Sequence, residues 1–110
     1  MVQTNAVKEN INKLINDLQK KNIRVSYIVL YGSHAKGRAG KDSDIDIAVI
    51  SPDFGQNPLN DSKVVYKSIF NLDIEPNFDV KTFSLEEFEK NNHYFVKEIK
   101  RTGKKIYPSV

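Results

Sequence analysis

The chain has 110 residues, of which 39% are hydrophobic and 28% are charged, and its formal net charge is +3 at pH 7. This length predicts one domain over residues 1–110, built on a single core. The absence of cysteine excludes disulfides and thiolate metal sites. No apolar run is typical of a signal peptide or a membrane span, so we expect a cytoplasmic protein.

The first third of the chain predicts a helix followed by two strands. Thr4 can cap a helix that ends at Asn22. Residues 23–31 are rich in β-branched and aromatic side chains, which predicts a buried strand. Gly32 breaks this strand, and a second strand is predicted over residues 44–51. The apolar positions of the helix, at helical spacing, are Val7, Ile11, Leu14, Ile15 and Leu18.

The middle of the chain predicts a loop, a helix and a third strand. Residues 51–58 are rich in turn formers, and Asp61 or Ser62 can cap the helix that follows. Residues 72–83 predict a strand interrupted at Pro76, which indicates an edge strand or a bend.

The last part of the chain predicts further helix and a short extended tail. Ser84 and Glu87 have the spacing of a capping box, and an apolar helical face extends from there to Ile99. Gly103 can end that helix. The expected fold class is α+β, a short twisted mixed sheet with helices packed on one face. We expect the first and the C-terminal helix to cover the hydrophobic side of the first two strands.

The most informative stretch joins the first two strands. Gly32-Ser33 follows the first strand, and Asp44 and Asp46 open the second. Alternate residues of a strand share a face, so both carboxylates point the same way. A glycine-serine turn at a helix start accommodates phosphate, and two carboxylates on one face can hold a hard cation beside it.

This stretch resembles the signature of the DNA polymerase β-like nucleotidyltransferase superfamily, and in particular its minimal members. The resemblance rests on Gly32, Ser33, Asp44 and Asp46, with Lys36 standing where the family commonly has arginine. It implies that the chain transfers a nucleoside monophosphate, AMP from ATP, to a hydroxyl. Two Mg²⁺ ions would clamp the attacking and leaving oxygens in such a site.

The resemblance also implies roles for individual residues. Gly32, Ser33 and Ser43 are expected to contact the nucleotide. Lys36 and Arg38 are close enough in sequence to reach its β- or γ-phosphate, although a solvated position explains them equally well.

A third metal-binding carboxylate is expected on a neighbouring strand. Asp73, Glu75 and Asp79 are the candidates, and on a regular strand Asp73 and Glu75 would share a face. The run that contains Glu75 looks like the corresponding stretch of small relatives. We therefore choose Glu75 as the third catalytic and metal-binding residue after Asp44 and Asp46, with Asp73 second and Asp79 third.

The acceptor is expected to be another protein. Minimal nucleotidyltransferases resemble antitoxins that are paired with a small helical HEPN-domain toxin. A chain of this size leaves little room for an acceptor domain of its own, and a stable nucleic-acid partner is not expected. Pure masking of the toxin, or transfer to a small molecule or RNA, remain alternatives. The apolar residues Phe54, Leu59, Phe78 and Tyr107 could form a partner patch or complete the core.

Other metal or phosphate sites are disfavoured by the sequence. An EF-hand loop starting at Asp42 needs glycine at its sixth position and glutamate at its twelfth, which here are Ile47 and Asp53. A P-loop would require Gly-Lys-Ser/Thr, which is absent. His34 and His93 are too far apart in sequence to indicate a metal site.

Overall fold

The central strand of the protein is buried on both of its faces. The computed structural model describes residues 4–32, 45–74, 78–90 and 94–108. In β2 (Ile45–Ser51) every residue except Asp46 is buried. A strand of this kind needs a helical layer on each side of the sheet, since apolar side chains project alternately from both faces.

β2 pairs with two neighbours in a four-stranded sheet of order β3-β2-β1-β4. β1 (Tyr27–Tyr31) runs antiparallel to β2 and to β4 (Lys104–Tyr107), whereas β3 (Phe78–Ser84) runs parallel to β2. The parallel pair is joined through the helix α3 (Pro58–Asn71), as such a connection requires. The predicted α+β class with a mixed sheet is confirmed.

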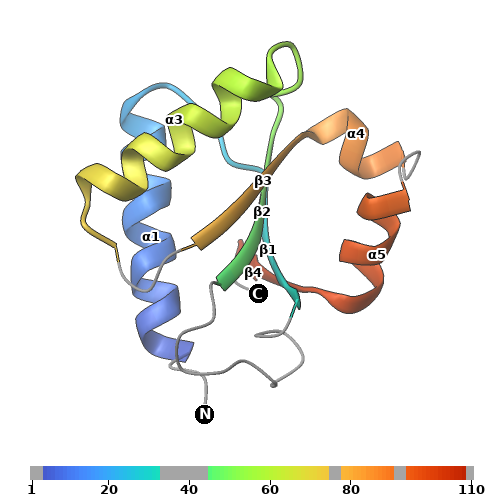
Figure 1. The fold of residues 1–110 in the computed structure, drawn as a ribbon, viewed down its shortest axis with the longest axis horizontal. Helices are drawn as coiled ribbons and strands as arrows, with labels where there is room; N and C mark the ends of the chain where they lie inside the picture. The colour runs from blue at the N-terminus through green and yellow to red at the C-terminus, as the bar shows by residue number, and fades with distance from the viewer. Residues whose placement is uncertain (1–3, 33–44, 75–77, 91–93, 109–110) are drawn as a thin grey trace.

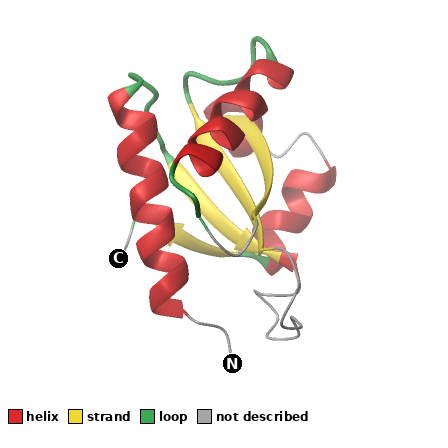
Figure 2. Ribbon diagram, turned by 60° about the vertical axis from the view of Figure 1, so that its left-hand side comes forward, coloured by secondary structure: helices red, strands yellow, loops and turns green. Residues whose placement is uncertain are grey.

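Helices cover both faces of this sheet, which corrects the expectation that they pack on one (Figure 1). α1 (Thr4–Lys20) and α3 pack on the side of Ile28, Ile47 and Val80, as Figure 2 also shows for the layer in front of the sheet. α4 (Leu85–Lys90) and α5 (Tyr94–Thr102) pack on the other side, against Val29 and Ile50. The first and the C-terminal helix therefore lie on opposite faces.

The predicted third strand is too long at its N-terminal end. α3 continues to Asn71 and is capped at Leu72, and Asp73 follows with a left-handed backbone (φ 52°). The described part of the strand is Phe78–Ser84. The apolar residues before it serve the helix end and the core, where Ile74 is buried.

The start of α3 was also predicted at the wrong residue. Asn57 is the N-cap, with its side chain accepting a hydrogen bond from the backbone N–H of Asn60, and Pro58 occupies the first helical turn. Asp61 is instead buried and accepts a hydrogen bond from Gly55 N–H at 2.9 Å. It thereby fixes the loop before the helix.

Other local predictions are confirmed. The expected apolar stripe of α1 is buried, and the Ser84–Glu87 capping box forms with hydrogen bonds of 2.9 and 3.0 Å. The first strand is shorter than predicted, starting at Tyr27. No helix among the described residues is long and apolar enough to span a bilayer.

An ion pair fastens the chain just before β1 to the turn after β2. The Arg24 guanidinium and its backbone N–H all donate to the Asp53 carboxylate, at 2.8 to 3.3 Å. The hydrogen bonds from the Arg24 side chain, and then from its backbone, lower the pKa of Asp53. A group with a depressed folded-state pKa contributes stability above its unfolded pKa of about 3.9 and loses it as pH falls through the folded value.

Asp53→Asn should therefore destabilise the protein at neutral pH but less so in acid. The difference in unfolding free energy between the two proteins is expected to shrink as pH falls below about 4. Denaturant titrations between pH 7 and pH 2.5 would measure it, with Arg24→Gln as a second variant that lacks the same pair. A difference that stays constant across this range would contradict the prediction.

Candidate functional site

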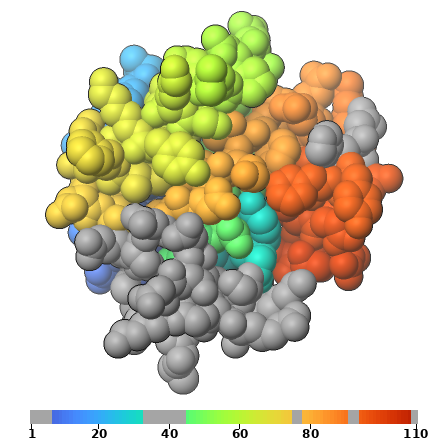
Figure 3. All heavy atoms as spheres, in the orientation of Figure 1, coloured from blue at the N-terminus to red at the C-terminus, as the bar shows by residue number. Residues whose placement is uncertain are grey.

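Three adjacent strands place a row of polar side chains at one end of the sheet. Tyr31 of β1 is paired with Asp46 of β2, and Asp46 is paired with Asp79 of β3. Paired residues project to the same face, and neighbouring strands lie about 4.8 Å apart. The two carboxylates are therefore neighbours on the α4–α5 face of the sheet. Tyr31, Asp46 and Asp79 together are called the carboxylate row below. In Figure 3 atoms of β1 and β2 reach the surface between β3 and α5, so part of this face is uncovered.

Gly32 lies directly against the Asp46 carboxylate. Its backbone is left-handed (φ 75°), and a Cβ at this position would collide with Asp46 Oδ2 and lie 3.0 Å from Asp46 Cγ. Only glycine permits both this backbone conformation and this approach. The turn after β1 and the first carboxylate of β2 are thus packed as one unit.

The surroundings of Tyr31 at this end of the sheet disfavour loss of its phenolic proton. Burial is the main cause that raises the pKa of Tyr31, and the negative charges of Asp46 and Asp79 raise it further. Its ring packs edge-on against Phe95 of α5, with 5.8 Å between centroids. Tyr31 therefore stays protonated beside the two carboxylates at neutral pH.

Most of the predicted site residues lie outside the described part of the chain. Ser33, Lys36, Arg38, Ser43, Asp44 and Glu75 belong to this group, as do His34 and His93. Of the predicted nucleotide and metal ligands, Gly32 and Asp46 are described, and the structure brings them together. Among the described residues no group of three potential metal ligands forms.

The structure places two of the three candidates for the third carboxylate, Asp73 and Asp79, and Glu75 lies outside the described residues. Asp73 is in the turn after α3 rather than on a strand, so it shares no strand face with Glu75. Asp79 stands beside Asp46 in the parallel register. Strand register is set by packing between distant segments, which explains why the sequence ranked Asp79 last.

Asp79 makes its polar contacts with two side chains that the sequence did not single out. Lys81, two residues on along β3, lies 3.7 Å from Asp79 Oδ1. Tyr66 of α3 donates from its hydroxyl to the same oxygen at 3.5 Å and accepts from Val80 N–H at 2.8 Å.

The donor set suits a hard divalent cation. Adjacent carboxylates offer the oxygen ligands that Mg²⁺ prefers, and the described residues of the row include no sulfur or imidazole ligand. Asp46 and Asp79 would hold the ion beside the turn at Gly32.

A family profile matches most of the chain. The profile described as "Polymerase beta, Nucleotidyltransferase" matches residues 12–109. The chain belongs to the polymerase β nucleotidyltransferase family. No curated protein matches it significantly.

Solved structures of nucleotidyltransferases and antitoxin complexes share this fold. A toxin-antitoxin structure with AMP-PNP is 29% identical, with a TM-score of 0.56 and coverage of 89% of this chain and 70% of the other. An MNT antitoxin in complex with tri-AMPylated HEPN toxin from Shewanella oneidensis is 25% identical (TM-score 0.52, covering 94% and 71%). A Sulfolobus solfataricus putative nucleotidyltransferase, 20% identical, matches in fold (TM-score 0.58, covering 78% and 70%). The predicted family and its antitoxin-type relatives are confirmed.

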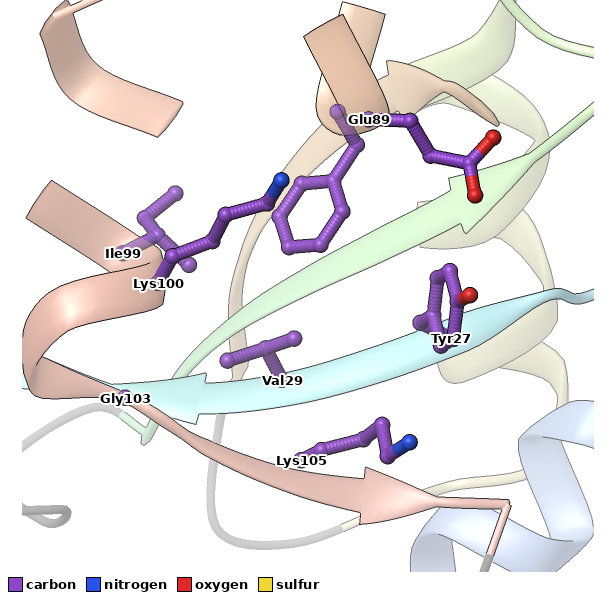
Figure 4. Close-up of a pocket in the computed structure, with 8 residues that line it drawn as sticks. Tyr27, Val29, Glu89, Ile99, Lys100, Gly103 and Lys105 are labelled. Atoms are coloured by element: carbon purple, nitrogen blue, oxygen red, sulfur yellow. The ribbon is translucent and has the colours of Figure 1, made fainter. Parts of the chain in front are cut away.

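A separate cavity of about 460 Å³ lies on the same sheet face of this nucleotidyltransferase, toward the opposite end of β1 (Figure 4). Its walls include the rings of Tyr27 and Phe88. The Lys105 ammonium lies 5.3 Å from the centroid of the Tyr27 ring, and the Lys100 ammonium lies 4.7 Å from the centroid of the Phe88 ring. Its lining contains neither Gly32 nor the carboxylate row.

The apolar residues considered for a partner patch divide between core and surface. Phe54 and Phe78 are buried, and Tyr107 packs against the core. Leu59 is exposed on α3, as is Phe70 at the other end of the same helix.

Proposed function

We propose that the protein is a Mg²⁺-dependent nucleotidyltransferase that transfers AMP from ATP to a hydroxyl on a helical HEPN-domain partner. The observation that carries this proposal is the packing of Gly32 against Asp46, with Asp79 beside it in register. That arrangement places two carboxylates that can bind a metal ion directly beside the turn that ends β1. The family membership supports the reaction class.

In this reaction the acceptor hydroxyl oxygen forms a bond to the α-phosphorus, and the bond from phosphorus to pyrophosphate breaks. Two Mg²⁺ ions, when bound, neutralise the charge that develops on the attacking and leaving oxygens. Asp46 and Asp79, together with Asp44, would hold the ions. Gly32 and Ser33 receive the phosphates, and Lys36, Arg38 and Ser43 contact the rest of the triphosphate.

We assign the third carboxylate to Asp79, which revises the choice of Glu75. The support is the register that pairs Asp79 with Asp46. Glu75 lies outside the described residues, and Asp73 is in the turn after α3. Asp79 would accept the proton that the acceptor hydroxyl loses as it attacks.

Asp79→Asn should reduce AMP transfer by about 10²- to 10⁴-fold, the range typical of losing a positioned acid or base. ATP binding should change much less, because Asp79 acts at the acceptor. Asp73→Asn and Glu75→Gln are the matched controls, and both should retain activity. An inactive Glu75→Gln beside an active Asp79→Asn would restore the sequence-based choice.

The protein partner is proposed because the similar structures include toxin-antitoxin complexes, one of them with an AMPylated toxin. Exposed Leu59 and Phe70 on α3 provide apolar surface that a helical partner could cover.

The decisive experiment is coexpression of this chain with the protein encoded beside it, followed by mass spectrometry of both. We expect additions of AMP mass on the neighbour that disappear with Asp46→Asn. A tight complex without added mass would instead indicate masking. Neither complex nor modification, together with nucleotide addition to a small molecule or RNA, would overturn the assigned acceptor.

A further inference from the structure

A side chain from α3 binds a backbone N–H at the outer edge of β3. Within the described part of the chain β3 is an edge strand, with β2 as its single partner. Tyr66 extends from α3, which packs on one face of the sheet, and its hydroxyl accepts the Val80 N–H at 2.8 Å. The same hydroxyl reaches Asp79, whose side chain is on the opposite face. Tyr66 thus links α3 to a carboxylate across the edge of the sheet.

Both polar contacts of Asp79 among the described residues fall on one carboxylate oxygen. Tyr66 donates to Oδ1 at 3.5 Å, and the Lys81 ammonium lies 3.7 Å from the same atom. Contacts on the Oδ1 side leave Oδ2 as the oxygen that can turn toward a metal ion beside Asp46. Partners that fix a ligand in this way are a regular feature of metal sites.

We propose that Tyr66 is a positioning residue that orients the Asp79 carboxylate for metal binding. The inference rests on the proposed role of Asp79 in the nucleotidyltransferase site. Lys81 is poorly suited to the same task, because an ammonium is repelled by a divalent cation bound to the same carboxylate. The neutral phenol can keep its hydrogen bond while the metal is present.

The stability of the fold depends little on the Tyr66 hydroxyl, because water can take its place. The side chain is 41% exposed, so solvent can reach the edge of the strand. If the hydroxyl is removed, water can accept the Val80 N–H. Water does not approach Oδ1 from one fixed direction, as the Tyr66 hydroxyl does. Removal of the hydroxyl should therefore weaken metal binding more than it lowers the stability of the fold.

The test is the binding of Mn²⁺ in the presence of α,β-methylene-ATP, whose bridge between the α- and β-phosphorus cannot be cleaved and therefore allows no transfer of AMP. Electron paramagnetic resonance measures the concentration of free Mn²⁺. Tyr66→Phe should raise the Mn²⁺ concentration for half-saturation about tenfold, in the range usual for partners of metal ligands. Its melting temperature should stay within about 3 °C of the wild type. Ser62→Ala is the matched control, since it removes another α3 hydroxyl that faces β3, 3.5 Å from Thr82 Oγ1.

Asp79→Asn separates failure of the inference from failure of the proposed function. If Asp79→Asn weakens Mn²⁺ binding while Tyr66→Phe behaves like Ser62→Ala, Tyr66 only closes the strand edge and the inference is wrong. If Asp79→Asn leaves Mn²⁺ binding unchanged, the proposed carboxylate set itself is wrong. Weakened binding in both Asp79→Asn and Tyr66→Phe, with Ser62→Ala unchanged, supports the proposal.

Discussion

Asp46→Asn is expected to lower AMP transfer by about 10³-fold, because a metal ligand supplies several kcal/mol of transition-state stabilisation and each 1.4 kcal/mol is tenfold in rate. Asp46 is the centre of the carboxylate row, between Tyr31 and Asp79, and it contacts the Gly32 turn. The amide has the same shape but lacks the charge that binds Mg²⁺. Calorimetry should show that Mg²⁺ no longer strengthens ATP binding.

Asp73→Asn is the control for this substitution. It makes the same chemical change at an exposed turn whose left-handed backbone asparagine tolerates well. Its folding, nucleotide binding and transfer rate should match those of the wild type. Metal-dependent ATP binding that survives Asp46→Asn would count against the whole site.

Gly32→Ala is expected to abolish metal-dependent nucleotide binding as well as destabilise the fold. Its left-handed backbone costs a non-glycine residue about 1–2 kcal/mol. In addition, the new Cβ would occupy the position of the Asp46 carboxylate, which must then move. Thermal unfolding and calorimetry with Mg²⁺-ATP would measure the two effects separately.

Gly55→Ala separates the backbone effect from the effect on the site. Gly55 also has a positive φ (113°), and a Cβ there would lie 2.9 Å from Ser84 Cβ, outside the carboxylate row. It should lose stability but retain nucleotide binding. Equal losses of binding in both variants would show that destabilisation, rather than displacement of Asp46, is responsible.

The sequence alone was sufficient for the features that depend on short-range chemistry. The apolar stripe of α1 and the Ser84–Glu87 capping box are determined by residues within a few positions of each other, and both are confirmed. The proximity of Gly32 and Asp46 was also predictable, because the glycine-serine turn and the strand that begins with the carboxylates follow one another in the chain. The period of a strand fixed Asp46 on the face opposite Ile45 and Ile47.

Tertiary structure decided which residues meet across strands and which faces the helices cover. Asp79 lies beside Asp46 because β3 pairs in parallel with β2, in a register that depends on packing between distant segments. The contact of Tyr66 with Asp79 likewise requires α3 to lie along the edge of β3. α5 packs on the face opposite α1 because β2 is apolar on both faces and needs cover on each. Local periodicity identifies a buried helix face but not the side of the sheet that buries it.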